Sequence, residues 1–582
     1  MCDLIDKKVI IYGVGRFRKD FLYIFDKLNV KYSVTDNEQL VSIEKKVKYF
    51  KCLEKENKNK YVVVICEYSK ENAINNLENM GYVYKKNYWN AEDLFQELDK
   101  KYIQNITEDL FGTIDYLFFE KIRGKKLVIW GTGNYSSELI NANPQIKIDY
   151  FIDSNLKITG KLYNGKTIKH PDMIQDWKNI YIIIATINYY YEIRDYLIEV
   201  GLKENIDFAL YRTALHSPFK TQKPSEMLIK TIYDKPLKKR NCFEPFSHIE
   251  VNYEGGMCLC CPNRIEIPGG YLYKVSFKEA WTSIVSKIIR LSMINRTFSF
   301  CNKNNCPNLN FNDEIMNRDT IICEDDYKMK QTLYPEHINI GIDNSCNLMC
   351  TTCRNKIKIA NKEEKKRINI IADKLLEIVP YTKTLVMAGN GEIFFNESYR
   401  KIWIKNENEA KRDTIYVISN GILFNAENWN KLKQSYNNVK LTISVDASTK
   451  KTYDRIRCGG DFNKLIKNLK YASMLKKSGE LKFFQLNYVI QSLNCFEMDE
   501  FVMMAKKLNA DRVYFTRVMN WGTYSTSEFE KISLFDNNDI IKDKYIKLFK
   551  SNILKDPIVD LSFLYNFTDS NGEYIIKKIV GE

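Results

Sequence analysis

The chain has 582 residues, of which 45% are hydrophobic and 13% aromatic, so it can form several buried cores and is not a disordered chain. Its 88 basic and 73 acidic residues give a net charge of +15, which permits an anionic partner, but no basic block interleaved with aromatics stands out. The longest apolar runs have the length of strands, so no membrane span is expected. Charged Lys7 and Lys8 interrupt any apolar signal core, and we expect a cytoplasmic protein.

The first part of the chain contains an internal repeat. An apolar strand leads into a glycine turn at residues 8–15, and residues 127–133 repeat this pattern. Four pairs of landmarks share offsets of 117 to 120 residues: Gly13 and Gly131, Asp36 and Asp153, Tyr61 and Tyr181, Gly81 and Gly201. The offsets predict two tandem βαβ modules, over residues 1–105 and 106–215.

Each module has an acidic residue about 20 positions after its glycine turn, as nucleotide-binding α/β folds do. The third glycine of the dinucleotide fingerprint is absent from both copies, so a docking module that binds no nucleotide is an equally open interpretation. The second copy resembles the Rossmann-like modules of nucleotide-sugar-modifying acyltransferases and sugar methyltransferases, through residues 128–133, 151–155 and 182–186.

Residues 216–240 contain three prolines and end in a cluster of lysine and arginine, which predicts a linker. A cysteine-rich block over residues 241–325 follows. Ten of the fifteen cysteines lie between Cys242 and Cys353, and the odd total argues against a disulfide framework. So many thiols in a reducing compartment indicate metal or iron–sulfur ligation.

Residues 326–582 alternate between strand-like and helix-like segments. Six strands are predicted, over residues 337–343, 382–388, 414–419, 441–446, 483–490 and 512–518. Amphipathic stretches such as 363–378 and 465–475 separate most of them. Repeated βα units favour a parallel sheet, and six of them fit a partial barrel whose chemistry lies at the carboxyl ends of the strands. A C-terminal extension follows the last strand.

Directly after the first of these strands, Cys346, Cys350 and Cys353 have the spacing Cys-x3-Cys-x2-Cys. Three thiolates on one short loop can hold three irons of a 4Fe–4S cluster and leave the fourth iron open, which is typical of a catalytic site. The same spacing would also form a buried stripe on a helix. The intervening Asn, Ser and Thr residues favour turns over a helix interior, and therefore favour the cluster.

This motif resembles that of the radical SAM superfamily, and motifs at later strand ends agree with it. The resemblance implies binding of S-adenosylmethionine, whose amino group would lie near Gly389, Asn390, Gly391 and Glu392 after the second strand. Ser419-Asn-Gly421 follows the third strand, as a similar motif does in the family. The remaining implied contacts with S-adenosylmethionine are Ser444, Asp446, Arg457 and Asn487.

The activity that the resemblance implies is reductive cleavage of S-adenosylmethionine on the 4Fe–4S cluster. A 5′-deoxyadenosyl radical would then abstract a hydrogen atom from the substrate, and the protein would supply orientation and exclude water. An electron donor such as flavodoxin or ferredoxin is the implied redox partner.

The cysteine-rich block resembles a SPASM-type auxiliary cluster domain. The resemblance implies Cys242, Cys260, Cys301 and Cys306 as ligands of one auxiliary 4Fe–4S cluster, with Cys261 and Cys258 as alternates. The block precedes the barrel, whereas it follows the barrel in the common pattern. Structural zinc on the same thiolates remains a rival interpretation.

The leading hypothesis is an α/β radical SAM enzyme with an auxiliary cluster, acting on a peptide or a glycan or nucleotide-sugar substrate. An RNA-modifying radical SAM enzyme is the alternative within the same chemistry, although no RNA-binding module is evident. A non-catalytic iron–sulfur or nucleotide-binding scaffold and a nicotinamide oxidoreductase are the rivals from other classes.

Overall fold

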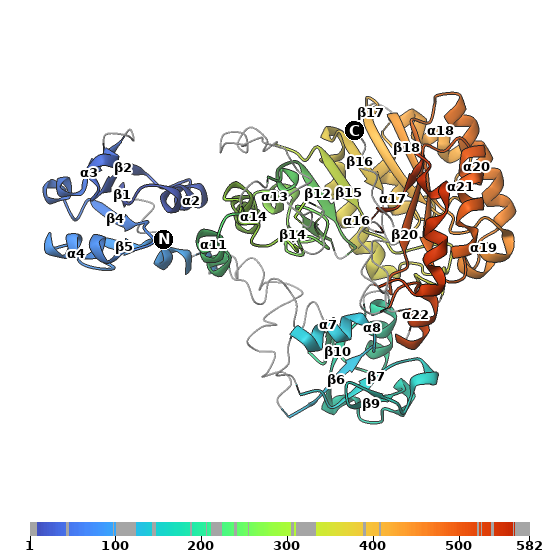
Figure 1. Cartoon of the computed structure of the whole chain (residues 1–582). Coiled ribbons are helices and arrows are strands. Elements are labelled where there is room, and N and C mark those ends of the chain that lie inside the picture. The colour runs from blue at the N-terminus through green and yellow to red at the C-terminus, as the bar shows by residue number, and fades with distance from the viewer. Residues whose placement is uncertain are drawn as a thin grey trace.

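The computed structural model of the chain describes residues 8–41, 46–96, 98–99, 124–142, 147–186, 189–204, 206–210, 224–237, 241–253, 255–303, 306, 308–309, 333–354, 356–387, 391–406, 409–520, 523–524, 526–536, 540–562 and 564. These residues form three sheets (Figure 1). The architecture is mixed α/β, as the alternation of apolar strands and amphipathic segments predicted.

The first sheet is built from the first repeat and has five parallel strands in the order β3-β2-β1-β4-β5. Its strands are short apolar runs whose central members are buried on both faces, as expected where helices cover a parallel sheet. They are β1 (Lys8–Tyr12), β2 (Val30–Thr35), β3 (Val47–Tyr49), β4 (Tyr61–Ile65) and β5 (Tyr88–Asn90), with helices α2 (Arg16–Ile24), α3 (Glu38–Val41) and α4 (Glu71–Asn79).

The second sheet is built from the second repeat and has the order β11-β10-β6-β7-β9-β8. Its strands are β6 (Lys126–Trp130), β7 (Tyr150–Ile152), β8 (Leu162–Tyr163), β9 (Lys166–Lys169), β10 (Ile180–Ile184) and β11 (Phe208–Leu210), with helices α7 (Asn134–Ala142) and α8 (Tyr190–Glu199). The arrangement β7-β6-β10 reproduces β2-β1-β4, and in both repeats the glycine turn follows the central strand. The two repeats therefore share the order of their three central strands.

The glycine turn of the first repeat requires glycine for a steric reason. Gly13 has a φ angle of 127°, and a Cβ atom placed on it would lie 2.5 Å from the carbonyl oxygen of Cys66. Gly131 has the corresponding conformation in the second repeat, with a φ angle of 110°. The two glycines let the chain pass close to the end of the neighbouring strand.

The third sheet has ten strands and contains all six strands predicted for the last part of the chain. Its order is β14-β13-β12-β15-β16-β17-β18-β19-β20-β21, and the strands from β15 to β20 run parallel. The six predicted strands are β15 (His337–Ile340), β16 (Thr384–Met387), β17 (Arg412–Ser419), β18 (Tyr436–Ser444), β19 (Phe483–Ile490) and β20 (Arg512–Arg517). The short strand β21 (Val559–Asp560), from the C-terminal extension, pairs with β20.

Alternation of side chains along these strands separates two faces of the sheet. On β19, for example, Phe484, Leu486 and Tyr488 are fully buried, whereas Gln485 and Asn487 face the other side. The buried face packs against amphipathic helices, which lie along the outer side of the sheet (Figure 1). The helices are α16 (Lys362–Leu376), α17 (Glu397–Trp403), α18 (Ala426–Ser435), α19 (Lys450–Ile456), α20 (Phe462–Lys477), α21 (Met498–Lys507) and α22 (Thr526–Ile532).

The cysteine-rich block extends this third sheet and does not form a sheet of its own. Strand β12 pairs in parallel with β15, so that His248 lies opposite His337. The hairpin strands β13 and β14 then continue the sheet beyond β12. The block consists of β12 (His248–Val251), β13 (Gly256–Cys258) and β14 (Pro268–Tyr271), with helices α12 (Glu244–Ser247), α13 (Phe277–Trp281) and α14 (Ile284–Ile294).

The predicted linker over residues 216–240 is wrong in its central part. Residues 224–233 form helix α11 (Pro224–Tyr233), and its apolar face buries Met227, Leu228 and Ile232 in the main core. Proline at the first position of a helix starts the helix, since its fixed φ angle suits that position. Residues 216–223 and 238–240 of the predicted linker lie outside the described residues.

The first repeat packs against α11 and α14. The buried carboxylate of Asp99 accepts hydrogen bonds from the backbone N–H of Ser225 (2.9 Å) and from its hydroxyl (2.5 Å). Helix α2 contacts α14, where Asn295 donates to Asp20 over 2.7 Å and Lys287 pairs with Asp26 over 2.9 Å. The first repeat and the cysteine-rich block thus share one hydrophobic core.

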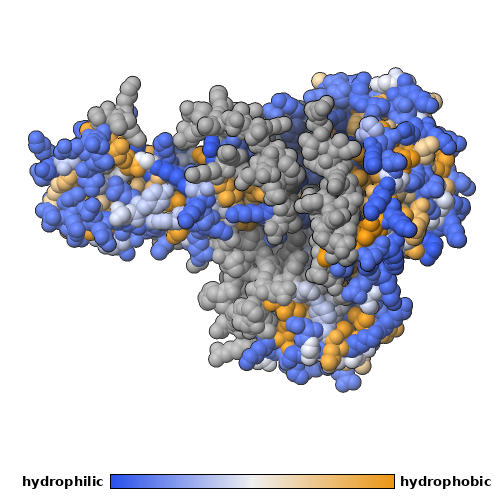
Figure 2. Space-filling view, in the orientation of Figure 1, coloured by the Kyte–Doolittle hydropathy of each residue, from blue (hydrophilic) through white to orange (hydrophobic). Residues whose placement is uncertain are grey.

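Hydrophilic side chains cover most of the described surface on the face seen in Figure 2, and hydrophobic ones are scattered among them. Within the described ranges, no helix combines the length and the apolar character that crossing a membrane requires.

We expect Asp99→Ala to destabilise the chain by about 1–3 kcal/mol, because the buried Ser225 donors would lose their acceptor. The matched control is Asp26→Ala, which removes an ion pair with exposed partners across the same contact and should change stability by about 0–1 kcal/mol. Chemical denaturation followed by fluorescence measures both values. Equal losses for the two variants would contradict a stabilising role of the buried contact.

Candidate active site

The three cysteines of the Cys-x3-Cys-x2-Cys motif lie on the loop between β15 and α16. Residues 343–354 form turns and contain no helix. Cys346 and Cys350 are each 8% exposed, and Cys353 is half-buried. Burial raises the pKa of Cys350 to about 11, and the neighbouring thiols of Cys353 and Cys346 add to this shift. The three thiols thus share one loop, and Cys353 and Cys346 lie close enough to Cys350 to influence its pKa.

Arg354 follows the third cysteine and fixes the loop. Its Nη2 and Nε atoms lie 3.3 and 3.4 Å from the Cys353 sulfur, and its Nη1 donates to the carbonyl of Asn344 over 2.7 Å. A guanidinium this close stabilises a thiolate, which is the form that binds metal. Arg354 was not among the predicted site residues, although a cation directly after the last cysteine is a signal visible in the sequence.

The other two thiols also face N–H donors. Nη1 of Arg457 lies 3.6 Å from the Cys350 sulfur, and Nδ2 of Asn420 lies 3.8 Å from the Cys346 sulfur. The two donors come from other parts of the domain, since Asn420 follows strand β17 and Arg457 follows helix α19. Donors around ligating sulfurs tune a metal centre, so these residues belong to the surroundings of the site.

Glu392 lies at the centre of the strand-end loops. It is 1% exposed, and its carboxylate accepts hydrogen bonds from the hydroxyl of Ser419 (2.8 Å) and the backbone N–H of Asn420 (2.7 Å). Its own N–H donates to the carbonyl of Ser345 over 2.9 Å. Burial raises the pKa of Glu392, and the hydrogen bonds from Asn420 and Ser419 oppose that shift. The residue therefore joins the loops that follow β15, β16 and β17.

Gly391 is held against the cysteine loop. A Cβ atom at this position would lie 2.6 Å from the carbonyl oxygen of Ser345 and closer still to that of Asp343. Only glycine fits this approach. The predicted contacts Gly389 and Asn390 lie outside the described residues.

Asp446 and Arg457 form a buried ion pair of 2.7 Å. Asp446 follows β18 and also accepts a hydrogen bond from the backbone N–H of Val489 (2.8 Å). Burial opposes the charge on Arg457, but Asp446 and Cys350 outweigh it and raise the pKa of Arg457. Nε of Arg457 is buried without a hydrogen-bond partner in the described part of the chain, so the guanidinium retains a donor for a ligand.

Ser444 and Asn487, the last two predicted contacts, are register neighbours on β18 and β19. Both side chains lie on the half-exposed face of the third sheet. Asn487 accepts a hydrogen bond from Gln485 over 2.7 Å. The structure therefore places them near the carboxyl ends of the strands, on the same sheet as Asp446.

A second group of cysteines lies in the cysteine-rich block. Burial raises the pKa of Cys301, and Cys242, Cys306 and Cys260 are its next largest influences. Burial likewise raises the pKa values of Cys242 and Cys260 to about 12. Cys242, Cys260 and Cys306, the other members of the preferred ligand set, thus lie close enough to Cys301 to raise its pKa.

The alternates lie in different surroundings. Burial raises the pKa of Cys261, and its charged neighbours are Glu250 and Arg264. Cys258 is the last residue of β13. Among the described residues, no three His, Cys, Asp or Glu side chains are grouped so that they could hold one metal ion.

The second repeat contacts the segment that follows the cysteine motif. Glu192 on α8 pairs with Lys356 over 3.0 Å, and Asp195 accepts a hydrogen bond from the side chain of Asn361 over 3.1 Å. Between these two residues, the carbonyl of Lys358 accepts a hydrogen bond from the N–H of Cys346 over 2.9 Å. Helix α8 therefore supports the backbone that holds Cys346.

Comparison with family models assigns two parts of the chain. Residues 342–484 match the radical SAM superfamily, and this range contains the three cysteines and most of the strand-end residues described above. The chain carries a radical SAM domain. The cofactors that the superfamily implies are S-adenosylmethionine and a 4Fe–4S cluster. Residues 123–206, in the second repeat, match the family described as C2185-like, N-terminal.

Solved structures resemble the chain over part of its length. SuiB of Streptococcus suis bound to S-adenosylmethionine is 18% identical with a TM-score of 0.26, and the match covers 34% of this chain and 43% of SuiB. SuiB bound to the precursor peptide SuiA is 15% identical with a TM-score of 0.29, covering 50% and 62%. The enzyme anSMEcpe with bound AdoMet and Kp18Cys peptide is 18% identical with a TM-score of 0.28, covering 39% and 64%. The chain thus spans less than two thirds of each, and no curated protein matches it.

The residues of the radical SAM domain fit both cofactors. Three neighbouring thiols, each facing an N–H donor, suit a cluster with one open iron. The buried carboxylate of Glu392 suits an ammonium group, and the unpartnered Nε of Arg457 suits a carboxylate.

We expect Arg354→Gln to lower the midpoint potential of the cluster on this loop by tens of millivolts, because reduction adds negative charge beside a cation that the variant lacks. Redox titration followed by electron paramagnetic resonance measures the potential. Lys358→Gln is a matched control, since Lys358 is a nearby cation that pairs with the carboxylate of Glu364 over 3.7 Å. An unchanged potential for Arg354→Gln, with the iron content retained, would contradict this role.

Proposed function

We propose that the chain is a radical SAM enzyme that abstracts a hydrogen atom from a peptide or carbohydrate-type substrate and carries one auxiliary 4Fe–4S cluster. The observation that carries the proposal is the meeting of Cys346, Cys350 and Cys353 with Glu392 and Arg457 at the carboxyl ends of parallel strands. When bound, the reduced cluster and S-adenosylmethionine supply a 5′-deoxyadenosyl radical.

The residues of the chain have separate tasks in this proposal. The three thiolates hold the cluster, while Arg354 and Arg457 offset their negative charge. Glu392 holds the amino group of S-adenosylmethionine, and Nε of Arg457 holds its carboxylate. Ser444 and Asn487 face the half-exposed side of the sheet, where the nucleoside would lie. These contacts orient the reacting bond and exclude water from it.

The six parallel strands from β15 to β20, in sequential order, support a partial (βα)6 barrel around this site. The central strand and glycine turn of each repeat support Rossmann-like modules. In the first repeat, burial raises the pKa of Glu67 to about 7, and the nearby Asp36 contributes to the shift. Two carboxyl groups beside the glycine turn repel a phosphate, which favours docking over nucleotide binding for the first repeat.

The hairpin, the closing cysteines and the neighbourhood of Cys242, Cys260, Cys301 and Cys306 support a SPASM-like auxiliary centre. Four thiolates suit either an iron–sulfur cluster or zinc. We favour the cluster because the block continues the sheet of the radical SAM domain, beside β15.

The first test measures 5′-deoxyadenosine released by anaerobically reconstituted protein given S-adenosylmethionine and dithionite. We expect release by the wild-type protein and at least a hundredfold less from Cys346→Ala, because one iron loses its protein ligand. Cys495→Ala is the matched control, since Cys495 is a buried thiol outside both cysteine groups. Absence of release from iron-loaded wild-type protein would contradict radical chemistry.

The auxiliary centre is tested in the variant that lacks Cys346, Cys350 and Cys353. We expect this variant to retain about four iron atoms per chain, all in the auxiliary cluster. Adding Cys260→Ala and Cys301→Ala should remove them, whereas adding Cys261→Ala should not. Elemental analysis and absorption spectra measure the metal. Zinc in place of iron in the parent variant would overturn the proposed cluster.

A further inference from the structure

Asp446, which forms the buried ion pair with Arg457, has an unusual backbone conformation. Its φ angle is 61°, in the left-handed region that residues other than glycine adopt uncommonly. Such a conformation persists where the surrounding structure holds it in place, and it is often found at functional sites. Asp446 is 2% exposed and follows the end of β18, so the contacts that hold it lie inside the fold.

The carboxylate of Asp446 has two partners. The register pairing of β18 with β19 ends at Ser444 and Asn487, and beyond it Oδ1 of Asp446 accepts the backbone N–H of Val489 over 2.8 Å. A side chain thus takes a donor that a strand carbonyl accepts in a regular parallel pair. Oδ2 of Asp446 pairs with Nη2 of Arg457 over 2.7 Å. The carboxylate therefore links β19 to the guanidinium, and its position determines where Nη2 lies.

The side chain of Asn494 holds the backbone of Asp446 from the loop that follows β19. Asn494 is fully buried, and its Nδ2 donates to the carbonyl of Asp446 over 2.9 Å and to that of Val489 over 3.0 Å. Its Oδ1 accepts the N–H of Gln491 over 2.8 Å. A buried amide whose donors and acceptor are all in use fixes the groups that it joins. Asn494 therefore ties the loop after β18 to the loop after β19.

A second side chain of the same loop holds the segment that follows Asp446. The carboxylate of Glu497 accepts hydrogen bonds from the N–H and the hydroxyl of Ser448, over 2.8 and 3.0 Å, and from the hydroxyls of Thr449 and Thr452. Burial opposes its charge, but these hydrogen bonds outweigh burial and lower the pKa of Glu497. Glu497 is half-buried, so it is a milder place for a substitution than Asn494.

We infer that Asn494 is a positioning residue for S-adenosylmethionine, because it holds Asp446 and thereby orients the guanidinium of Arg457 toward the carboxylate of the ligand. The inference rests on the proposed function, in which Nε of Arg457 binds that carboxylate. Nη1 lies 3.6 Å from the Cys350 sulfur and Nη2 pairs with Asp446, so these two contacts determine the direction of Nε. Nε is buried without a partner in the described part of the chain. Loss of Asn494 would release one of the two anchors of the guanidinium.

The test compares the binding of S-adenosylmethionine with that of methylthioadenosine, which lacks the amino and carboxylate groups. Anaerobic calorimetry on cluster-loaded protein measures both dissociation constants. For Asn494→Ala, we expect the affinity for S-adenosylmethionine to fall about tenfold or more, because a hydrogen bond to a charged group is lost. The affinity for methylthioadenosine should stay within about twofold of the wild type. Glu497→Gln should act in the same direction by a smaller factor, since it leaves the bonds of Asn494 in place.

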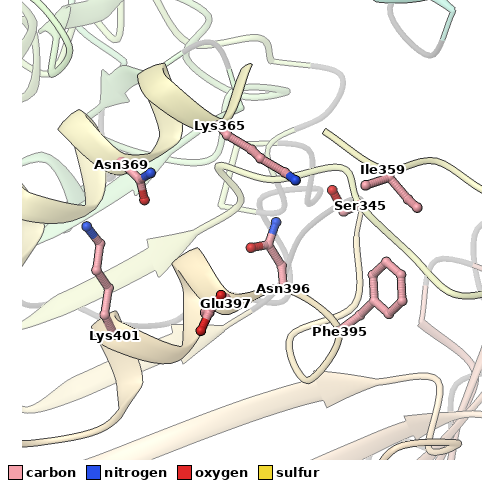
Figure 3. A pocket seen from close by; sticks show the side chains of 8 residues that line it. All are labelled: Ser345, Ile359, Lys365, Asn369, Phe395, Asn396, Glu397 and Lys401. Atoms are coloured by element: carbon pink, nitrogen blue, oxygen red, sulfur yellow. The ribbon is translucent and has the colours of Figure 1, made fainter. Parts of the chain in front are cut away.

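Two asparagine variants are matched controls. Asn428→Ala removes a buried amide that donates to the carbonyl of Leu423 over 2.9 Å, away from the ion pair. Asn369→Ala changes the lining of an open cavity of about 530 Å³ between α16 and α17, which Ser345 of the cysteine loop also lines (Figure 3). Asp446 and Arg457 are absent from that lining. Both variants should leave the two dissociation constants within about twofold of the wild type.

Circular dichroism and iron content establish that each variant is folded and loaded. If Asn494→Ala is not, the same criteria apply to Glu497→Gln. An unchanged affinity for S-adenosylmethionine would overturn the inference. Equal losses for the two ligands would also overturn it, because Asn494 would then support the fold in general. Wild-type protein that binds both ligands equally well would instead count against the proposed roles of Glu392 and Arg457 themselves.

Discussion

The buried carboxylate of Glu392 is the interaction on which the geometry of the active site depends. A carboxylate removed from water is costly unless hydrogen bonds compensate it, so its donors must stay in place. Those donors belong to the loop after β17, while the backbone of Glu392 is bonded to the cysteine loop after β15. One residue thereby couples three strand ends. The close approach of Gly391 makes the same coupling steric, since it leaves no room for the cysteine loop to move toward β16.

The parallel pairing of β12 with β15 gives the two cysteine groups a common frame. Cys242 lies just before α12 and β12, and Cys260 lies just after β13, whereas the radical SAM cysteines follow β15. Adjacent strands in a sheet hold a fixed spacing and register. The backbone hydrogen bonds of this continuous sheet therefore help to set the separation between the two proposed centres.

The sequence was most informative where local pattern determines structure. Strand β19 begins and ends at the residues expected from its alternation, whereas β18 begins at Tyr436, five residues before the expected start. The polar residues at its beginning hide the strand, and pairing with β17 reveals it. The prolines of residues 216–240 predict a linker and give no sign of helix α11, although proline also starts helices.

Contacts between segments that are distant in the chain could not be predicted from the sequence. The spacing predicted that Cys346, Cys350 and Cys353 would share a loop, but the approach of Asn420 and Arg457 to their sulfurs depends on how the sheet is assembled. The sequence alone likewise does not show where β13 ends. Cys258 is the last residue of that strand, whereas Cys260 and Cys261 follow it. The support that α8 gives to the segment after the cysteines has no local signal, because its partners lie more than 160 residues apart.

The hydrogen bonds between Asp99 and Ser225 bear on how the second repeat is connected to the rest of the chain. They join two residues that flank the whole second repeat, which makes that repeat an insertion into a unit formed by the first repeat and the cysteine-rich block. The points of entry and exit are already in contact, so a chain without residues 100–223 could close with a short connection. Such a chain would lack α8 and its contacts with Lys356 and Asn361. It would show how the radical SAM domain behaves without the second repeat.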